Sequence, residues 1–552
     1  MRWMGALLLL PLALALAAQT KPEDPCSISG QVTNAATGEP VRRALVYLRR
    51  IDMSPGMSNI QVSNTVTTDA AGRFAMAGVA PGKYRLSAER NGFLVAQYGA
   101  RGAGKPGTLL TLEPGQNSSD LTMRMTPHGV IAGRVLDEEG EPVPSANVQV
   151  SRQQYIQGRK QMSRMNGAST NDLGEYRVFG LAPGRYYVSA DTRPNQMLAQ
   201  TEDEYVTTYF PRATDGAAAA PIDVTPGAQL RNIDIALAKM HTVTVRGRVA
   251  SEVGPPAGGE NARRTNLNVM LSARNAMVAG GGFNRGATVT PDGTFELRGV
   301  TPGSYFVVGL VNAQGKTFTA RAPIQVGSSN IEGITLAIRG GVPVSGRVRV
   351  EGESSASIGQ LRVTLQPAAM GGIMFAPIPT QQVKENGSFQ LDDVGADQYM
   401  VSIGSLPEGF YVKSVRSANL DVLADGLEIA GGSPAPLDVV LSPNAGQVTG
   451  TVLDPKTQKA AAAMTVVLVP QEKERRDREA FYRTTTSDLA GLFTFKGVVP
   501  GEYRVYAWED AEYGAWMDPD FLKPLESRGE ALSVTEGGRP AVQVNLIPAD
   551  SQ

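Results

Sequence analysis

The sequence predicts an all-β protein built from five tandem antiparallel β-sandwich modules, and three observations carry this prediction. A sequence motif, which we call the phrase, recurs along the chain. It runs from an Asp-Gly turn through an aromatic residue to Gly, Pro-Gly and Tyr. An opening sequence of an apolar residue, any residue, Gly, any residue and Val recurs at a similar interval. Between these landmarks apolar and polar residues alternate, which is typical of half-buried strands.

The two landmarks share one period of roughly 100 residues, which indicates a tandem repeat. The glycines of the opening sequence are Gly30, Gly133, Gly247, Gly346 and Gly450. The copies of the phrase are residues 69–84, 172–186, 292–305, 386–399 and 488–503. The copy at 386–399 is degenerate because it lacks the Pro-Gly. We therefore expect the protein to act through its repeated modules rather than through a single catalytic centre.

Each part of the repeat has a structural explanation. In the first copy, residues 30–33, 44–48, 74–76 and 84–88 alternate as strands do, and residues 121–125 form a closing strand. The Asp-x-Gly and Asp-x-x-Gly elements are expected at hairpin reversals, because Gly accepts positive φ and Asp bonds its own backbone. Pro-Gly before the tyrosine is a second turn signal. Only residues 471–482 show any helical periodicity.

These residues resemble the carboxypeptidase regulatory-like domain. The resemblance lies in the order Gly-x-Val, then Asp-x-x-Gly-x-Phe/Tyr, then Gly-Val/Leu-x-Pro-Gly-x-Tyr, seen for example in Gly30-Gln-Val32 and in residues 69–84. It implies a transthyretin-like, Ig-like sandwich of seven strands, found in tandem in exported bacterial proteins. In metallocarboxypeptidases this domain accompanies the peptidase domain and has no catalytic residues of its own. The resemblance therefore implies a fold and no activity.

The landmarks predict the domain organisation. We expect a signal peptide at residues 1–20, module one at 21–126, module two at 127–240, module three at 241–340, a degenerate module four at 341–443 and module five at 444–552. Arg2 followed by the apolar run Leu7–Leu16 and a small-residue site at Ala15-Leu-Ala17 is typical of a cleaved secretory segment. The expected location is therefore the periplasm, the cell surface or the extracellular space, with no transmembrane segment in the mature chain.

The composition of the chain limits the kinds of partner that it is expected to bind. The 552 residues carry a formal net charge of −1, which argues against binding to nucleic acid or to an anionic membrane surface. Cys26 is the only cysteine, so each module must be held by its own apolar core. Lipid attachment at Cys26 is the weaker alternative to a free thiol, because acidic residues and proline precede it. Expected partners are other envelope or extracellular proteins or polysaccharide.

Few residues in the chain could support catalysis. His128 and His241 are the only histidines, and both lie just before an opening sequence, where a linker role is expected. The sequence has no His-Glu-x-x-His, Cys-x-x-Cys or Gly-x-Ser-x-Gly motif. Asp69, Asp172, Asp292 and Asp488 supply one carboxylate per turn, which is too few for calcium. We therefore expect no enzymatic activity, no metal and no cofactor.

Aromatic residues that follow the phrase are the candidate ligand-binding residues. Module five is the richest, and module two has a smaller set; the candidates are Tyr506, Trp508, Tyr513, Trp516, Tyr209 and Phe210. Aromatic faces beside carboxylates bind sugars by stacking and hydrogen bonding. The alternative is that these rings close the end of the sandwich.

Another connection, between the second and third strands, varies in length and composition between modules: residues 50–64, 151–166 and 471–479. Functional differences between modules are expected there. The sequence thus favours a non-catalytic exported structural or interaction protein, acting as a spacer or adhesin-like rod at the cell envelope. A carbohydrate- or polymer-binding protein that uses its aromatic connections, foremost in module five, is the alternative.

Overall fold

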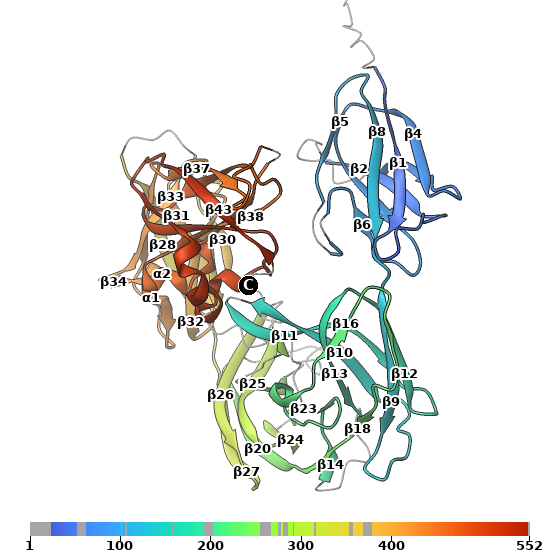
Figure 1. Cartoon of the computed structure of the whole chain (residues 1–552). Coiled ribbons are helices and arrows are strands. Elements are labelled where there is room, and N and C mark those ends of the chain that lie inside the picture. Colours follow the sequence, from blue (N-terminus) through green and yellow to red (C-terminus); the bar gives the residue numbers. More distant parts are fainter. Residues whose placement is uncertain are drawn as a thin grey trace, which may run out of the picture. The chain divides into compact units, whose positions relative to one another are not determined.

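The computed structural model is an all-β structure with short helices only (Figure 1). It describes residues 24–51, 62–100, 102–104, 107–156, 158–192, 203–253, 267–273, 278–279, 285–290, 292–313, 316–352, 357–367, 378–488 and 490–549. The chain divides into two compact units. The first holds residues 1–133, 177–185 and 222–233, and the second holds residues 134–176, 186–221 and 234–552.

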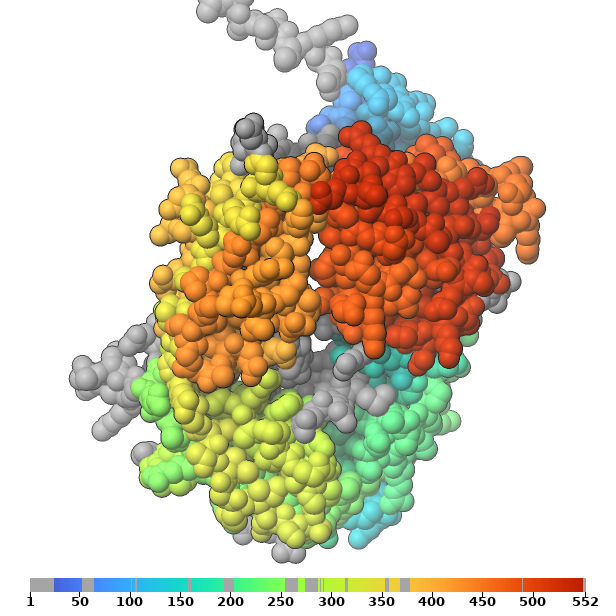
Figure 2. Space-filling view, turned by 90° about the vertical axis from the view of Figure 1, so that its left-hand side faces the viewer, coloured from blue at the N-terminus to red at the C-terminus, as the bar shows by residue number. Residues whose placement is uncertain are grey.

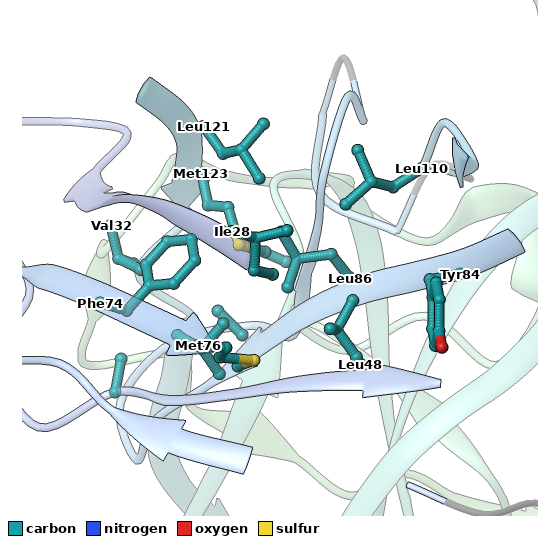
Figure 3. Close-up of a cluster of buried hydrophobic side chains, with 14 of the residues drawn as sticks. Ile28, Val32, Leu48, Phe74, Met76, Tyr84, Leu86, Leu110, Leu121 and Met123 are labelled. Carbon is teal, nitrogen blue, oxygen red and sulfur yellow. The ribbon is translucent and has the colours of Figure 1, made fainter. Parts of the chain in front are cut away.

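Module one is a sandwich of two sheets. One sheet has the order β4-β1-β8, made of β4 (Arg73–Val79), β1 (Cys26–Asn34) and β8 (Asn117–Met125). The other has the order β3-β2-β5-β6, made of β3 (Val62–Thr67), β2 (Leu45–Arg50), β5 (Gly82–Glu89) and β6 (Ala96–Gln97), with β7 (Leu110–Leu112) added to β5. Figure 3 shows Ile28, Phe74, Leu86 and Met123 packed together in the core between these sheets.

Module two repeats this plan with a longer second strand. Its first sheet contains β9 (Gly129–Leu136), β12 (Glu175–Leu181), β17 (Gln229–Leu230) and β18 (Ile235–Ala236). Its second sheet contains β15 (Thr208–Tyr209), β13 (Gly184–Asp191), β10 (Asn147–Ile156) and β11 (Arg159–Ser169), with β16 (Ile222–Val224) on β13. At its edge β11 pairs with β22 (Val278–Ala279), which comes from the residues expected in module three. A separate ribbon pairs β14 (Asp203–Tyr205) with β19 (Lys239–His241), and a single turn of 3-10 helix, η1, spans Gly216–Ala218.

Modules three and four have the same two layers. In module three they are β24 (Thr294–Val300), β20 (Val243–Ser251) and β27 (Ile331–Ile338), against β23 (Arg285–Thr288), β21 (Asn268–Ala273), β25 (Gly303–Ala313) and β26 (Lys316–Val326). In module four they are β31 (Ser388–Val394), β28 (Val342–Val350), β36 (Leu437–Ser442), β33 (Tyr411–Ser417) and β34 (Leu420–Asp421), against β30 (Thr380–Gln382), β29 (Arg362–Pro367), β32 (Asp397–Gly404) and β35 (Leu427–Ile429). One short helix, α1 (Val422–Asp425), follows β34.

Module five joins its strands into one sheet of seven. The order is β39 (Arg483–Thr486), β38 (Thr465–Pro470), β41 (Gly501–Trp508), β43 (Ala541–Ile547), β37 (Gly446–Leu453) and β40 (Leu492–Val498), with β42 (Glu530–Val534) paired to β41. In the space-filling view the red residues of this module form one closely packed body (Figure 2). Residues 471–482, where the sequence showed helical periodicity, form helix α2 (Lys473–Arg476) and the 3-10 turn η3 (Glu479–Phe481).

The opening strand has the same two neighbours in four modules. It pairs antiparallel with the strand that carries the aromatic residue of the phrase, and parallel with the closing strand. In the antiparallel pairs the opening glycine faces the aromatic residue: Gly30 with Phe74, Gly247 with Phe295, Gly346 with Phe389 and Gly450 with Phe493. The sheets are thus mainly antiparallel, and each of these modules adds one parallel pair between its first and last strands.

The tyrosine that ends the phrase closes the turn before it. Its hydroxyl donates to the carbonyl four residues earlier, from Tyr84 to Ala80 at 2.8 Å and from Tyr503 to Val499 at 2.7 Å. Module four keeps this bond without the Pro-Gly, since Tyr399 donates to Gly395 at 3.0 Å. Asp393, with φ 57°, takes the left-handed position that glycine occupies in the other copies, which Asp tolerates. The degenerate copy therefore retains the turn.

The hairpin reversals of modules one and five follow the expected chemistry, and that of module two departs from it. The Asp69 carboxylate accepts backbone N–H bonds from Ala71 and Arg73 at 2.9 and 2.8 Å, and Asp488 does the same in module five. In module two the neighbouring Asn171, rather than Asp172, accepts these bonds. The amide oxygen of Asn supplies the same acceptor, which explains why the turn does not need the Asp at this position.

Candidate functional site

The strongest candidate site lies on module five, where two strands are buried on both faces. Val466 and Leu468 of β38 point into the inner core, as they do in an ordinary sandwich. Val467 and Val469 of β38 point to the other face and form a second apolar cluster with Tyr506 and Trp508 of β41. A strand buried on both faces needs a continuous apolar run, and Val466–Val469 is such a run.

The second cluster is covered by residues 511–528, which we call the cap. The cap contains the short helical segments η4 (Ala515–Met517), α3 (Pro519–Leu522) and η5 (Lys523–Arg528). Asp518 begins α3 by accepting the N–H of Asp520 at 2.9 Å, an N-cap arrangement. Trp516, Leu522 and Leu525 are buried against the outer face of the sheet. The cap thus converts what would be a solvent-facing sheet surface into a second core.

The aromatic residues of module five form one connected set. The rings of Tyr506 and Trp508 stack with centroids 5.2 Å apart, and Trp508 stacks with Trp516 at 6.1 Å. Tyr513 meets Trp516 edge to face at 5.2 Å. Trp508 is 0% exposed, Tyr506 1% and Trp516 3%, whereas Tyr513 is 66% exposed.

These exposures correct the expectation of an open aromatic surface. Tyr506, Trp508 and Trp516 present no face on which a ligand could stack, because alternation along β41 points Tyr506 and Trp508 under the cap. They have a structural role, as the alternative predicted, although they pack on the outer face of the sheet rather than at the end of the sandwich. Of the module five candidates, Tyr513 alone offers its ring to solvent.

A cavity of about 450 Å³ lies beside Tyr513. Its lining combines aromatic, hydroxyl and carboxylate groups from module five with two residues of module two: Tyr482, Glu479, Thr484, Tyr513, Gly514, Trp516, Met517, Tyr155 and Ile156. The Tyr513 hydroxyl donates to the Glu479 carboxylate at 3.0 Å. Burial, followed by this hydrogen bond, raises the pKa of Tyr513, so the phenol stays protonated and can donate. The arrangement can hold a polar ligand by one ring and one carboxylate.

Tyr209 and Phe210 lie in and just after β15, outside this set. Tyr209 exchanges two backbone bonds with Ala213, and Phe210 donates its N–H to Val188 at 2.8 Å. The Phe210-Pro211 peptide is cis. Burial raises the pKa of the half-buried Tyr209. These residues close a tight turn on the edge of the module two sheet.

The sequence did not single out Tyr155, Glu479, Tyr482 or Thr484 as cavity residues. Residues 151–166 and 471–479, which the sequence assigned to the variable connection between the second and third strands, include Tyr155 and Glu479. In the structure Tyr155 belongs to strand β10. Length variation was therefore a usable signal for the region, although nothing in the sequence tied residue 155 to residue 513.

The residues that could have supported metal or acid–base chemistry are engaged elsewhere. Within the described residues no group of three or more His, Cys, Asp or Glu side chains could hold a metal ion. His128 lies at the junction of modules one and two, where its backbone N–H donates to the Gly92 carbonyl at 3.1 Å and its ring centroid lies 6.0 Å from that of Phe179. His241 pairs with Asp203 in the β14–β19 ribbon, with a side-chain distance of 3.6 Å. Cys26 is buried in β1 and its thiol donates to the Glu113 carbonyl at 3.0 Å.

No helix in the described part of the chain has the length and apolar character of a membrane span.

Comparison with curated proteins finds no match. Among solved structures, the Bacillus anthracis TIE protein is similar at 11% identity over 77% of this chain and 76% of that one, with a TM-score of 0.16. A streptococcal ancillary pilin is similar at 11% identity over 55% and 99%, with a TM-score of 0.20. The minor pilin GBS52 of Streptococcus agalactiae is similar at 11% over 39% and 96%, with a TM-score of 0.22. These TM-scores are too low to imply a shared function.

The family comparison agrees with the residue pattern and the fold. The model of the carboxypeptidase regulatory-like domain matches residues 27–126 and 130–238, which are the regions of the first two sandwiches. Modules three to five repeat the strand framework of module one, including the glycine that faces the aromatic residue. The chain is thus an all-β array of tandem sandwich modules, in which residues 27–126 and 130–238 match the model of the carboxypeptidase regulatory-like domain.

Proposed function

We propose that this chain is a non-catalytic exported protein that acts through its repeated modules, as a spacer or adhesin-like rod at the cell envelope. The observation that carries the proposal is the repeated framework itself. In modules one, three, four and five the same opening strand, glycine contact and core recur, and in each module the apolar residues are used for packing. Such an array supplies length and surface, which are the properties of a structural or interaction protein.

The positions of the histidines and of the cysteine support this proposal. The two histidines lie at module junctions, and the single thiol is buried with a backbone partner. Several tyrosine hydroxyls that recur between modules bond to backbone carbonyls across turns, where they have a structural role. Partners would be other envelope or extracellular proteins, bound along sheet edges or connections.

The proposal is tested by locating the full chain in its native host. A C-terminally tagged chain should be recovered from the periplasm, cell surface or medium with residues 1–20 removed, and the mature N-terminus can be read by mass spectrometry. Chemical cross-linking in intact cells, followed by purification, should capture envelope components. Recovery of the uncleaved chain in the cytosol would contradict the proposal.

Carbohydrate binding in module five is the second candidate, and the cavity beside Tyr513 favours it. An exposed ring with a neighbouring carboxylate suits a sugar, which uses an apolar face and hydroxyl groups together. The test is a polysaccharide binding panel with the mature chain, Tyr513→Ala and the exposed control Leu420→Ala. Binding that falls more than about tenfold in Tyr513→Ala alone, the equivalent of about 1.4 kcal/mol, would support the site. Equal binding by both variants would rule it out.

A further inference from the structure

The β10–β11 hairpin of module two extends beyond the sheet that supports it (Figure 1). β10 pairs with β13 only through Asn147–Ser151, while its pairing with β11 continues to Ile156. We call residues 152–156 and 158–163 the arm. Within the described residues, the arm gains only Val278 and Ala279 of β22 as further strand partners, opposite Met162 and Ser163. A two-stranded ribbon is marginally stable in water, so its tip needs another surface to rest on.

The tip of the arm meets the cap of module five. The ring of Tyr155 approaches Phe521 edge to face, with centroids 6.2 Å apart. Tyr155 and Ile156 line the cavity together with Trp516 and Met517 of the cap. Both arm residues are only half exposed although they lie at the end of a hairpin. Burial is also the main reason why the pKa of Tyr155 is raised.

Two glycines allow the surfaces to come this close. A Cβ atom added to Gly158 of the arm would lie 2.8 Å from the carbonyl oxygen of Met517 and 2.9 Å from its Cβ. A Cβ added to Gly514 would lie 3.3 Å from the Cβ and the carbonyl oxygen of Tyr155. Both glycines have positive φ, 73° and 85°. The contact is therefore made by backbone on both sides, which requires a defined fit.

The charges on the two surfaces are complementary. Lys160 of the arm lies over the Tyr155 ring, 5.4 Å from its centroid. The hydrogen bond with Tyr155 raises the pKa of Lys160, and the nearby carboxylates Asp518 and Glu512 add to this effect. Both carboxylates belong to the cap, so the Lys160 ammonium group of the arm is attracted by two acidic residues of the cap. Opposite charge across a contact favours correct docking over other arrangements.

We infer that the cap of module five is an interaction surface whose partner is a β-hairpin arm, and that the arm of module two binds it within the same chain. The inference stands on the contact between residues 155–160 and 514–521 and does not depend on the proposed function. It assigns a role to the long hairpin of module two and to the residues inserted after β41. It also makes the cavity beside Tyr513 a product of docking, because the arm supplies one of its walls.

Tryptophan fluorescence offers a direct test in the full mature chain. The chain has three tryptophans, and Trp508 and Trp516 are the two that remain once residues 1–20 are removed. Gly158→Asn keeps the left-handed turn, which Asn tolerates, but places a side chain against Met517. We expect quenching by acrylamide to rise roughly twofold as the arm leaves and Trp516 becomes accessible. Gly140→Asn is the matched control, since Gly140 also has positive φ (89°) and has nothing within 4 Å.

A disulfide trap tests whether the backbones of the same two segments lie close together. Tyr155→Cys with Gly514→Cys places the two Cβ atoms near the roughly 3.5–4.5 Å that a disulfide requires. Mild oxidation should produce an intrachain bond between residues 155 and 514 at a yield that does not depend on protein concentration. Tyr155→Cys with Gly537→Cys is the control, because Gly537 is open to solvent.

Each outcome decides the inference. Raised quenching in Gly158→Asn alone, together with the intrachain bond, supports an arm bound in its own chain. Unchanged quenching in Gly158→Asn, or failure to form the 155–514 bond, would overturn the inference. A bond that forms between chains, in proportion to concentration, would overturn it as well, since the arm would then bind a second copy.

Discussion

Gly450 lies directly opposite Phe493 in the antiparallel pair of β37 and β40, and the phenylalanine ring fills the space above the glycine. A Cβ atom at position 450 would lie 2.4 Å from Cζ of that ring and 2.3 Å from the carbonyl oxygen of Val542 on the parallel neighbour. Gly346 has the same relationship to Phe389, at 2.4 Å. In modules three, four and five the opening glycine is therefore required by a close approach from two sides, and its φ is not in the left-handed region.

Gly450→Ala should destabilise module five because neither neighbour can move freely. One is backbone and the other is a ring buried in the core, so the substitution overpacks the site by about 1–3 kcal/mol. Urea unfolding followed by circular dichroism measures the change. Gly432→Ala is the control, since nothing lies within 4 Å of that glycine. Equal stability of the two variants would show that the close approach has no energetic consequence.

Trp508→Ala should cost about 3–5 kcal/mol in the unfolding of module five, as expected for removal of a large buried ring. Trp508 is fully buried between Tyr506, Trp516 and Phe521. Thermal unfolding monitored by circular dichroism provides the measurement. Tyr513→Ala, at an exposed position, should change stability by only about 0.5 kcal/mol. A mild effect at Trp508 would mean that the cap does not enclose a true second core.

Thr68→Val should destabilise module one by about 1–3 kcal/mol, because it leaves buried backbone groups without partners. The buried Thr68 hydroxyl accepts the N–H of Ala44 at 2.8 Å and donates to the Val41 carbonyl at 2.7 Å. Thr67→Val, at the exposed last residue of β3 and next to Thr68, is the matched control. Denaturant unfolding of both variants measures the change in the free energy of unfolding. Similar changes in Thr68→Val and Thr67→Val would contradict this role of the Thr68 hydroxyl.

Module four should lose stability at alkaline pH. Burial raises the pKa of Tyr399 to about 12, above the value of about 10 in an unfolded chain. Between these values the unfolded chain has released the phenol proton while the folded chain retains it, so the free energy of unfolding falls as pH rises. Below about pH 10 this contribution is fully present.

Tyr399→Phe isolates this effect. It removes the hydrogen bond to Gly395, at a cost of about 0.5–1.5 kcal/mol at neutral pH, and it also removes the titrating group. Urea unfolding from pH 8 to 12, with hydrogen exchange of module four peptides as the readout, should give a shallower pH dependence in the variant. The same slope in both proteins would show that Tyr399 does not carry the effect.

The repeat, the strands and the turns could be predicted because each depends on local sequence. Alternation places residues such as Phe74 and Met76 on the core face whichever strand lies beside them. The parallel pairing of β1 with β8 could not be predicted, since alternation defines a face and does not identify the partner of a strand. Similarly, the turn of module two uses Asn171 in place of Asp172, because either amide or carboxylate oxygen supplies the acceptor.

The site was harder to predict for a related reason. Tyr506 and Trp508 look like exposed residues when a sheet is assumed to have one solvent face. The signal that this face is covered was the continuous apolar run Val466–Val469 on the neighbouring strand, which a half-exposed strand would not contain. The contact between Tyr155 and Phe521 joins segments that are far apart in the chain, and no local pattern encodes it.

Hydrogen exchange on the mature chain carrying Gly450→Ala tests most directly whether the chain is an array of separately cored modules. The account predicts that peptides from residues 446–547 exchange faster while peptides from residues 26–125 keep the protection of the parent chain. A uniform loss of protection through residues 26–125 as well would contradict it, because a single cooperative core would then hold the chain together.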